Sequence, residues 1–310
     1  MSGEAGEIFL GRAVPDRNLG VDGATTVDVE IRAATPADAE QCGRVCFAAF
    51  TWISELRRFP ADFPTVDYAK AVIAHLIASL SVYGVVAESD GRIVGSNFID
   101  ERDAVRGVGP VSVDPDFHGR GVGKLLMKAV LERGANAGSV RLLQDAHNPT
   151  SLSLYASLGF DLKEPIALVT GRPASRPSGA LEVRPLEPRD LAPCASLCRE
   201  IHGFDRTNSL REAGAFEPRV GLRDGRIIAY ASSLTAWPVA HGVAQSEHDM
   251  TQLVLAAGVE SETVSFLVPM RTPLFRWSLQ EGLRTVKTMN LMSIGRYQEP
   301  SGCWFPSVIY

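Results

Sequence analysis

The chain has 310 residues, a length at which two domains are expected. Hydrophobic residues make up 45% and charged residues 22%, which is typical of a folded globular protein and excludes a disordered one. The net charge of −5 gives no general basis for binding nucleic acid or an anionic membrane, and it weakly favours a cationic substrate such as an amine.

The sequence also favours a cytoplasmic location. Its longest apolar runs, such as Ala71–Ile77 and Val264–Val268, are too short to cross a bilayer. The start, MSGEAGEIFLGR, lacks the basic and apolar regions of a signal peptide. Five cysteines are an odd number for a disulfide framework and have no obvious metal-binding partners. We therefore expect a reducing compartment, buried cysteines and no metal site.

In chain order, residues 1–27 are expected to be a loosely held arm, and an internal repeat follows. Residues 30–46, EIRAATPADAEQCGRVC, match residues 182–198, EVRPLEPRDLAPCASLC, without a gap. Each copy predicts a short strand and then a helix with Pro and Asp in its first turn. Further on, DGRIVG at 90–95 matches DGRIIA at 224–229. An Asp-Gly pair between two apolar runs predicts a β-hairpin in both copies.

A glycine-rich turn follows the first hairpin. Residues 108–131, VGPVSVDPDFHGRGVGKLLMKAVL, predict a strand ending at Val113, an Asp-Pro break and an apolar-periodic helix. Glycines let backbone N–H groups converge at the helix N-terminus, so the turn predicts a phosphate or pyrophosphate site. A P-loop is excluded because Leu125 stands where Ser or Thr is required. A Rossmann turn is disfavoured because several strands precede this segment.

The glycine-rich segment resembles the cofactor motif of the GNAT superfamily of acyl-CoA-dependent N-acyltransferases. That motif is a strand, then Val-x-Pro, then Gln/Arg-x-x-Gly-x-Gly/Ala opening a helix. Residues 113–115 and 118–123 follow it, with His118 in place of the usual Gln or Arg. A second family signature is similar to NPTSLSLYASLGF at 148–160. The resemblance covers roughly residues 29–165.

The resemblance implies a mixed, mostly antiparallel sheet flanked by helices, with acetyl-CoA as cosubstrate. Pantetheine would lie between splayed strands near 111–113 and 140–144, paired with the first like an added strand. The turn would hold the pyrophosphate, Asn148 would contact the pantetheine arm, and Tyr155 would be the general acid for the departing thiolate. The expected cofactor-binding residues are Val111, Ser112, Val113, His118, Gly119, Arg120, Gly121, Val122, Gly123, Lys124 and Asn148.

The implied reaction is direct attack of an amine on the thioester carbonyl, with the oxyanion held by a backbone N–H near Val113. It needs a general base or a water chain to one. The strand at 106–113 has no carboxylate where the family often places its base. The base stays open among Asp100, Glu101, Asp103, Asp145, His147 and water.

Residues 171–180, GRPASRPSGA, have the composition of a linker. We therefore expect a catalytic domain at 28–170 and a second domain at 181–310. The predicted fold class is α/β (α+β), with two tandem GNAT-like domains.

The second copy lacks a counterpart of the glycine-rich turn, and aligning Gly282 with Gly159 places Ser278 where the first copy has Tyr155. We interpret it as a degenerate GNAT-like copy. The apolar tail at 303–310 is expected to pack as a final strand. Three tryptophans are interpreted as core residues in preference to the lining of an acceptor pocket: Trp237, Trp277 and Trp304.

We predict a cytoplasmic acetyl-CoA-dependent N-acetyltransferase that acts on a primary amine of a small molecule or peptide. We expect a monomer or homodimer without a nucleic-acid, membrane or metal partner. The alternative is a CoA- or acyl-CoA-binding sensor or interaction module that does no chemistry. A Tyr155→Phe substitution separates the two, because an enzyme loses rate while keeping CoA binding and a sensor has no rate to lose.

Overall fold

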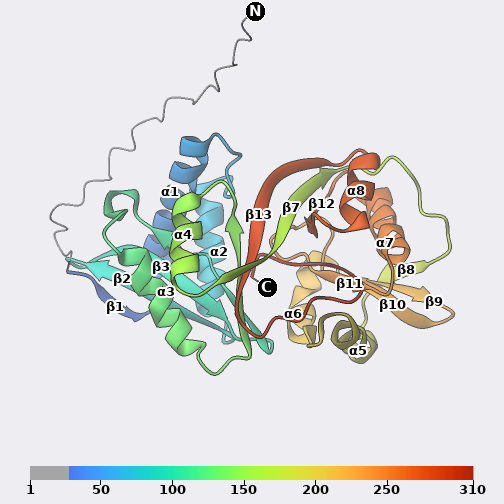
Figure 1. Ribbon diagram of the computed structural model, residues 1–310, viewed down its shortest axis with the longest axis horizontal. Helices are drawn as coiled ribbons and strands as arrows, with labels where there is room; N and C mark the ends of the chain where they lie inside the picture. The colour runs from blue at the N-terminus through green and yellow to red at the C-terminus, as the bar shows by residue number, and fades with distance from the viewer. Residues whose placement is uncertain (1–27, 310) are drawn as a thin grey trace, which may run out of the picture.

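The computed structural model describes residues 28–309, so the arm expected at 1–27 lies outside the described residues. None of the helices in this part of the chain is long and apolar enough to cross a membrane. The first half (Figure 1) forms β1 (Glu30–Ala33), α1 (Ala39–Arg57), α2 (Val66–Ala78), β2 (Val82–Ser89), β3 (Arg92–Asp100), β4 (Val105–Val108), β5 (Ser112–Val113), α3 (Val122–Arg133), β6 (Ser139–Asp145), α4 (Pro149–Ser157) and β7 (Asp161–Gly171).

The second half repeats this order in shorter form. It contains β8 (Glu182–Pro185), α5 (Leu191–His202), α6 (Thr207–Glu212), β9 (Arg219–Arg223), β10 (Arg226–Ala231), β11 (Gly242–Ala244), α7 (Glu247–Glu260), β12 (Val264–Pro269), α8 (Pro273–Gln280), β13 (Arg284–Gly295) and β14 (Cys303–Phe305).

The repeated strand–helix start has the same ion pair in both halves. Arg32 in β1 donates hydrogen bonds of 2.8 Å to both carboxylate oxygens of Asp38, which lies in the turn before α1. Arg184 and Asp190 form the same pair before α5, at 2.6 and 2.9 Å. The hydrogen bonds from Arg32 lower the pKa of Asp38, so this carboxylate stays charged and fixes the strand to the helix.

Both predicted hairpins are confirmed. Asp90 and Gly91 join β2 to β3 with φ angles of 50° and 73°, and Asp224 and Gly225 join β9 to β10 with 51° and 72°. Two consecutive positive φ angles are the requirement of a type I′ hairpin turn, which Asp-Gly meets at low cost.

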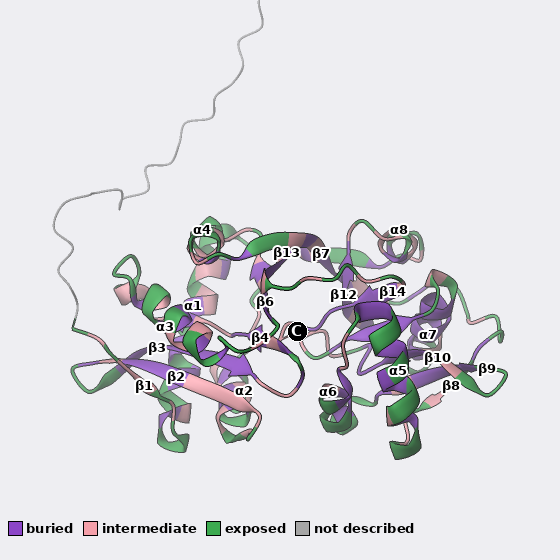
Figure 2. Cartoon of the chain, turned by 60° about the horizontal axis from the view of Figure 1, so that its bottom comes forward, coloured by how far each residue is buried: buried purple, intermediate pink, exposed green. Residues whose placement is uncertain are grey.

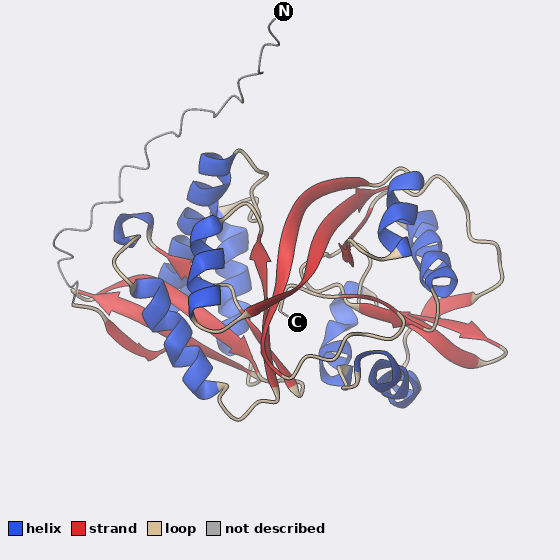
Figure 3. Cartoon of the chain, in the orientation of Figure 1, coloured by secondary structure: helices blue, strands red, loops and turns tan. Residues whose placement is uncertain are grey.

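The strands form two sheets. One has nine strands in the order β1-β2-β3-β4-β6-β13-β7-β12, with β5 paired to β3, and the other has five in the order β14-β11-β10-β9-β8. Within residues 28–309, the β4–β6 pair is parallel and every other strand pair is antiparallel. Helices lie against both sheets (Figure 3). This arrangement confirms the predicted mixed, mostly antiparallel fold class.

The two halves exchange their last long strands. β13 of the second half lies between β6 and β7 of the first, and β7 pairs in turn with β12 of the second half. The two strands run side by side across the centre of the molecule in Figure 1. The segment at 172–181 is a connection without helix or strand, as its composition predicts. The domain boundaries themselves stay a prediction, and the nine-stranded sheet continues across them.

Buried residues follow both sheets and the inner faces of their helices (Figure 2). All five cysteines are free and buried, as expected. In the first half the core between the sheet and α3 includes Leu126, Met127 and Val130, all fully buried. This packing fixes α3 and the turn before it against β5.

Helices α4 and α8 correspond in the two halves. Each has Pro at its first position, and each is followed by a glycine with positive φ, 94° at Gly159 and 93° at Gly282. The hydroxyl of Ser278, the counterpart of Tyr155, donates to the Leu274 carbonyl of its own helix at 2.8 Å. Ser278 therefore has a structural bond within α8.

Candidate active site

The backbone pairing shows the expected separation between the strands near 111–113 and 140–144. The parallel ladder of β4 and β6 ends at the pair Gly107 and Arg141. Beyond it, β6 continues to Asp145 with β13 on its other edge, and the first half's next strand, β5, pairs only with β3. Among the described residues, the facing edges of β5 and outer β6 have no strand partner. The sheet therefore opens at the carboxyl end of β6.

The open edge of β5 presents a backbone donor and acceptor at Val113. Val113 lies opposite Gly95 in β3, and the N–H of the next residue, Asp114, donates to the carbonyl of Val94 at 2.8 Å. Hydrogen-bonded and non-hydrogen-bonded pairs alternate in an antiparallel ladder. Val113 is therefore in a non-hydrogen-bonded pair, and its N–H and C=O point away from β3, toward β6. Val111 has the same parity.

The predicted cofactor residues differ in what they present to this opening. The Ser112 side chain is buried, with its hydroxyl 3.0 Å from that of Ser96. It therefore points to the sheet face on which the Ser96 side chain lies and not along the sheet into the opening. The Val122 side chain is buried in the core. Only the backbone of these two residues is available. Arg120 and Lys124 are exposed, and the Arg120 guanidinium lies 5.3 Å from the centre of the Phe117 ring.

The glycine turn has the open backbone that the sequence predicts. Gly119 and Gly121 have φ angles of 75° and 83°, and added Cβ atoms would meet nothing within 4 Å. Gly121 is the N-cap of α3, whose first turn contains no acidic residue. Gly123 is different, because a Cβ there would lie 3.4 Å from Leu154 of α4. The turn is thus an unobstructed helix N-terminus suited to an anion.

His118 is the first residue of the turn and contacts the end of β5. Its Nε2 lies 2.9 Å from the carbonyl oxygen of Val113, the acceptor that faces the opening. The ring packs edge-on against Trp52 of α1, with centroids 4.6 Å apart. His118 thus hydrogen-bonds the backbone group that would pair with an added strand.

Asn148 caps α4 at the far side of the opening. Its side-chain oxygen accepts a hydrogen bond from the Ser151 N–H at 3.2 Å. Its backbone carbonyl accepts from the Gln144 side chain at 2.8 Å. Both contacts fix the end of β6 to the start of α4.

Tyr155 lies in α4 with 8% of its surface exposed, and its ring is tilted against Phe160. Burial raises the pKa of its hydroxyl, and the charge of Asp145 raises it further. Tyr155 therefore stays protonated well above neutral pH. It has the protonation state that a general acid needs.

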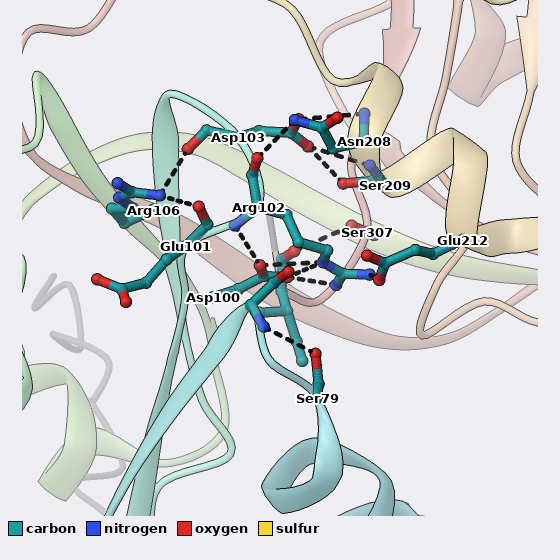
Figure 4. A network of polar contacts seen from close by, with 12 residues as sticks. Ser79, Asp100, Glu101, Arg102, Asp103, Arg106, Asn208, Ser209, Glu212 and Ser307 are labelled. Atoms are coloured by element: carbon teal, nitrogen blue, oxygen red, sulfur yellow. Dashed lines mark hydrogen bonds and ion pairs between the residues drawn. The ribbon is translucent and has the colours of Figure 1, made fainter.

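Three of the open base candidates lie at the wrong end of the sheet. Asp100, Glu101 and Asp103 precede β4, whereas the opening lies beyond its carboxyl end. All three have structural partners, and most of this network appears in Figure 4. Asp100 pairs with Arg102, Glu101 lies 2.9 Å from Arg133, and Asp103 accepts from Ser209 of the second half at 2.6 Å. These carboxylates stabilise loops and join the halves.

The other two candidates, Asp145 and His147, lie at the opening. The His147 ring stacks on Phe59, with centroids 4.2 Å apart and planes 13° apart. Both ring nitrogens are buried, and neither has a hydrogen-bond partner within residues 28–309. Burial lowers the pKa of His147, and Lys287 and Arg57 oppose the acidic side chains that would raise it. The imidazole is therefore neutral at neutral pH, as a proton acceptor must be.

Two charged residues at the opening were missed by the sequence reasoning. Lys287 of β13 lies 2.8 Å from Asp145 and 2.6 Å from Asp62, in the loop after α1. Its ammonium is 5.1 Å from the centre of the Trp237 ring. Trp237 thus has a polar contact beyond the core role expected for it, whereas Trp304 is buried in a core. The one available signal was a lysine in the otherwise apolar alternation of β13.

The described residues hold no group of three His, Cys, Asp or Glu side chains that could bind a metal ion.

Comparison with known proteins gives a consistent result. The model of the acetyltransferase (GNAT) family matches residues 49–160. N-alpha-acetyltransferase RimI of Mycobacterium tuberculosis (strain ATCC 25618 / H37Rv) is 32% identical over 141 residues, which are 44% of this chain and 81% of that protein.

Two solved structures extend the fold comparison to most of the chain. A putative acetyltransferase from Pyrococcus horikoshii has a TM-score of 0.69 at 18% identity and covers 90% of this chain and 94% of its own. A tandem GNAT protein from the clavulanic acid biosynthesis pathway has a TM-score of 0.54 at 13% identity and covers 87% and 100%. At these identities the likeness concerns the fold of both halves.

Proposed function

Because the chain belongs to the GNAT family and is an N-acetyltransferase, we propose that it moves the acetyl group of acetyl-CoA to a primary amine of a small molecule or peptide. The opening between β5 and β6 is the observation that carries the proposal. It combines a free backbone edge, an unobstructed helix N-terminus and a buried tyrosine in one place.

In this proposal the pyrophosphate of acetyl-CoA binds the backbone N–H groups of the turn from His118 to Lys124. The pantetheine arm pairs with the outward backbone groups of Val111 and Val113, replacing the His118 contact to the Val113 carbonyl. Asn148 contacts the arm from the α4 side. Arg120 and Lys124 add positive charge beside the phosphates.

The proposed chemistry uses one base and one acid. His147, neutral and without a hydrogen-bond partner among the described residues, takes a proton from the acceptor ammonium. The amine attacks the thioester carbonyl, and the outward N–H of Val113 stabilises the oxyanion. Tyr155 gives its proton to the departing thiolate and is reprotonated by the second proton that the attacking nitrogen loses as the amide forms, and the proton on His147 passes to solvent.

The peptide α-amine is the first acceptor class to test, because the relative with 32% identity is named an N-alpha-acetyltransferase. We propose no single acceptor sequence. The alternative of a CoA sensor without chemistry is disfavoured, because the chain belongs to an acetyltransferase family and is 32% identical to an N-alpha-acetyltransferase.

The second half is proposed to bind no cofactor, because the last strand of the chain fills the equivalent slot. Ala229 and Ala244 pair as Gly95 and Val113 do in the first half. By the same alternation, the backbone of Ala244 faces away from β10, and there it pairs with Cys303 of β14. β14 thus takes the place proposed for pantetheine.

The test is thiol release from acetyl-CoA in the presence of peptides with free N-termini and of small amines. Tyr155→Phe is expected to lower kcat by about 100-fold or more while the Kd for CoA changes little. Tyr230→Phe is the matched control, since it removes the hydroxyl of a buried tyrosine from the second half. Equal turnover by the wild type and Tyr155→Phe would reject the proposed acid.

A further inference from the structure

Lys287 crosses from the second half into the opening of the first. It lies in β13, the strand inserted between β6 and β7, and its side chain is only 3% exposed. A lysine buried to this degree requires compensation for its charge. The compensation comes from Asp62 and Asp145, whose side chains are each 13% exposed.

The partners of Lys287 come from three separate parts of the chain. Asp62 follows α1, Asp145 ends β6, and Trp237 lies in the second half before β11. Lys287 and Asp62 are 225 positions apart in the sequence. The Lys287 ammonium thus connects the two halves at the carboxyl end of β6, where the sheet opens.

The titratable groups that act on His147 are Asp145, Lys287, Asp62 and Arg57. Asp145 also acts on the hydroxyl of Tyr155. Burial by itself lowers the pKa of Lys287, but the charges of Asp145 and Asp62 outweigh burial and raise it. The ammonium therefore stays charged and the proposed acid and base share one electrostatic neighbour, Asp145.

We propose that Lys287 is a positioning residue of the acceptor site, through which the second half fixes Asp62 and Asp145 around His147. This inference rests on the proposed function. Two carboxylates and one ammonium leave a single negative charge, which attracts the ammonium of an incoming acceptor. Once the acceptor proton is on His147, the same two carboxylates stabilise the imidazolium. Lys287 lies between the two carboxylates, where its charge opposes the rise that burial causes in the pKa of Asp62, and it forms no bond to the acetyl group.

Removal of the Lys287 ammonium changes the pKa of His147 in a defined direction. Lys287 lowers the pKa of His147, so its loss raises that pKa. A larger fraction of the base is then protonated at a given pH, and the acidic limb of activity moves to higher pH. Two neighbouring carboxylates without a cation also repel, so one of them takes up a proton or moves out.

The experiment compares Lys287→Met, Lys287→Arg and the control Arg271→Met in the full chain. Arg271 also joins the halves, through the buried carboxylate of Glu164, but away from the opening. The pKa of His147 is measured by NMR of histidine-labelled protein, with His147→Gln to assign the signal. Acetyl-CoA binding is measured by calorimetry, and kcat and KM by thiol release with the best peptide amine found.

Lys287→Met is expected to raise the pKa of His147 by about one unit and to lower kcat by about 10- to 100-fold. Its Kd for acetyl-CoA stays within about twofold, because the phosphate turn is untouched. Lys287→Arg restores the pKa and most of kcat. Arg271→Met changes neither the pKa of His147 nor kcat, even where it lowers the free energy of unfolding. If Lys287→Met does not fold, Asp62→Asn/Lys287→Met removes the repulsion and still predicts a rise in the pKa of His147, smaller because the lost Asp62 charge opposes it.

An unchanged pKa of His147 and unchanged kcat in Lys287→Met would overturn the inference while leaving the proposed function in place. Equal losses in Lys287→Met and Lys287→Arg with no change in the pKa would also overturn it, because the role would be packing alone. Failure of the proposed function is a different result: the wild type would then release no thiol with any amine, although its histidine titration could still be measured.

Discussion

At the scale of single residues, the fold gives His147 and Tyr155 opposite protonation states from the same cause. Burial disfavours the charged form of each, so the imidazole stays neutral and the phenol stays protonated. A base and an acid that are both ready at neutral pH need no further pKa tuning. Asp145 lies where it acts on both.

The pH dependence of kcat/KM follows from these directions. The pKa of His147 is lowered, so the acidic limb is expected below the ordinary imidazole value, about 6.5. The pKa of Tyr155 is raised, so no basic limb from this group is expected below about pH 10. The measurement is a pH profile of kcat at saturating peptide beside that of kcat/KM, because the free α-amine of a peptide titrates at about pH 8 and affects only kcat/KM. His147→Gln should lose the acidic limb, and a limb that persists in this variant would assign the base elsewhere.

Sequence patterns were informative where the chemistry is local. The glycines of the turn, the asparagine cap and Tyr155 belong to one continuous stretch of chain, and the positive φ angles of Gly119 and Gly121 explain why glycine is needed there. Lys287 and Asp62 could not be paired in advance, because nothing local connects residues so far apart in sequence. The candidate bases could be told apart only from the parallel register of β4 and β6, which shows which of them lie at the open end of the sheet.

At the scale of elements, the strand exchange joins the two halves through one continuous sheet. The apolar patterns of β7 and β13 predict strands, yet an alternating pattern does not specify the neighbour of a strand. Each long strand here pairs along both edges with strands of the other half. The predicted tail strand is confirmed only at 303–305, β14, whose three residues are buried, while residues 306–309 form no strand.

Phe305 gives a quantitative test of β14. Its side chain is fully buried and packs against Phe266 at a centroid distance of 5.3 Å. Phe305→Ala is expected to lower the free energy of unfolding by about 3–5 kcal/mol. Phe216→Ala, at a site 41% exposed in the same half, should cost less than about 1 kcal/mol. Urea denaturation measures both, and equal small losses would mean that β14 does not pack as described.

At the scale of the whole molecule, the repeat has produced two different halves. The first has an open slot, a glycine turn and a buried tyrosine. The second fills its equivalent slot with β14 and begins α7 at Ser246, which caps the Asp249 N–H in place of a glycine turn. The two halves thus correspond to one proposed active site, to which the second half adds β13 with Lys287.

Calorimetric titration of the full chain with acetyl-CoA tests this account most directly. It predicts one binding site per chain and a loss of about 100-fold or more in affinity for Gly121→Val, because a β-branched residue is strained at positive φ and fills the phosphate turn. Gly225→Val, at a φ angle of 72° in an equally open hairpin of the second half, should leave the affinity unchanged. Two sites per chain, or full affinity in Gly121→Val, would contradict the account.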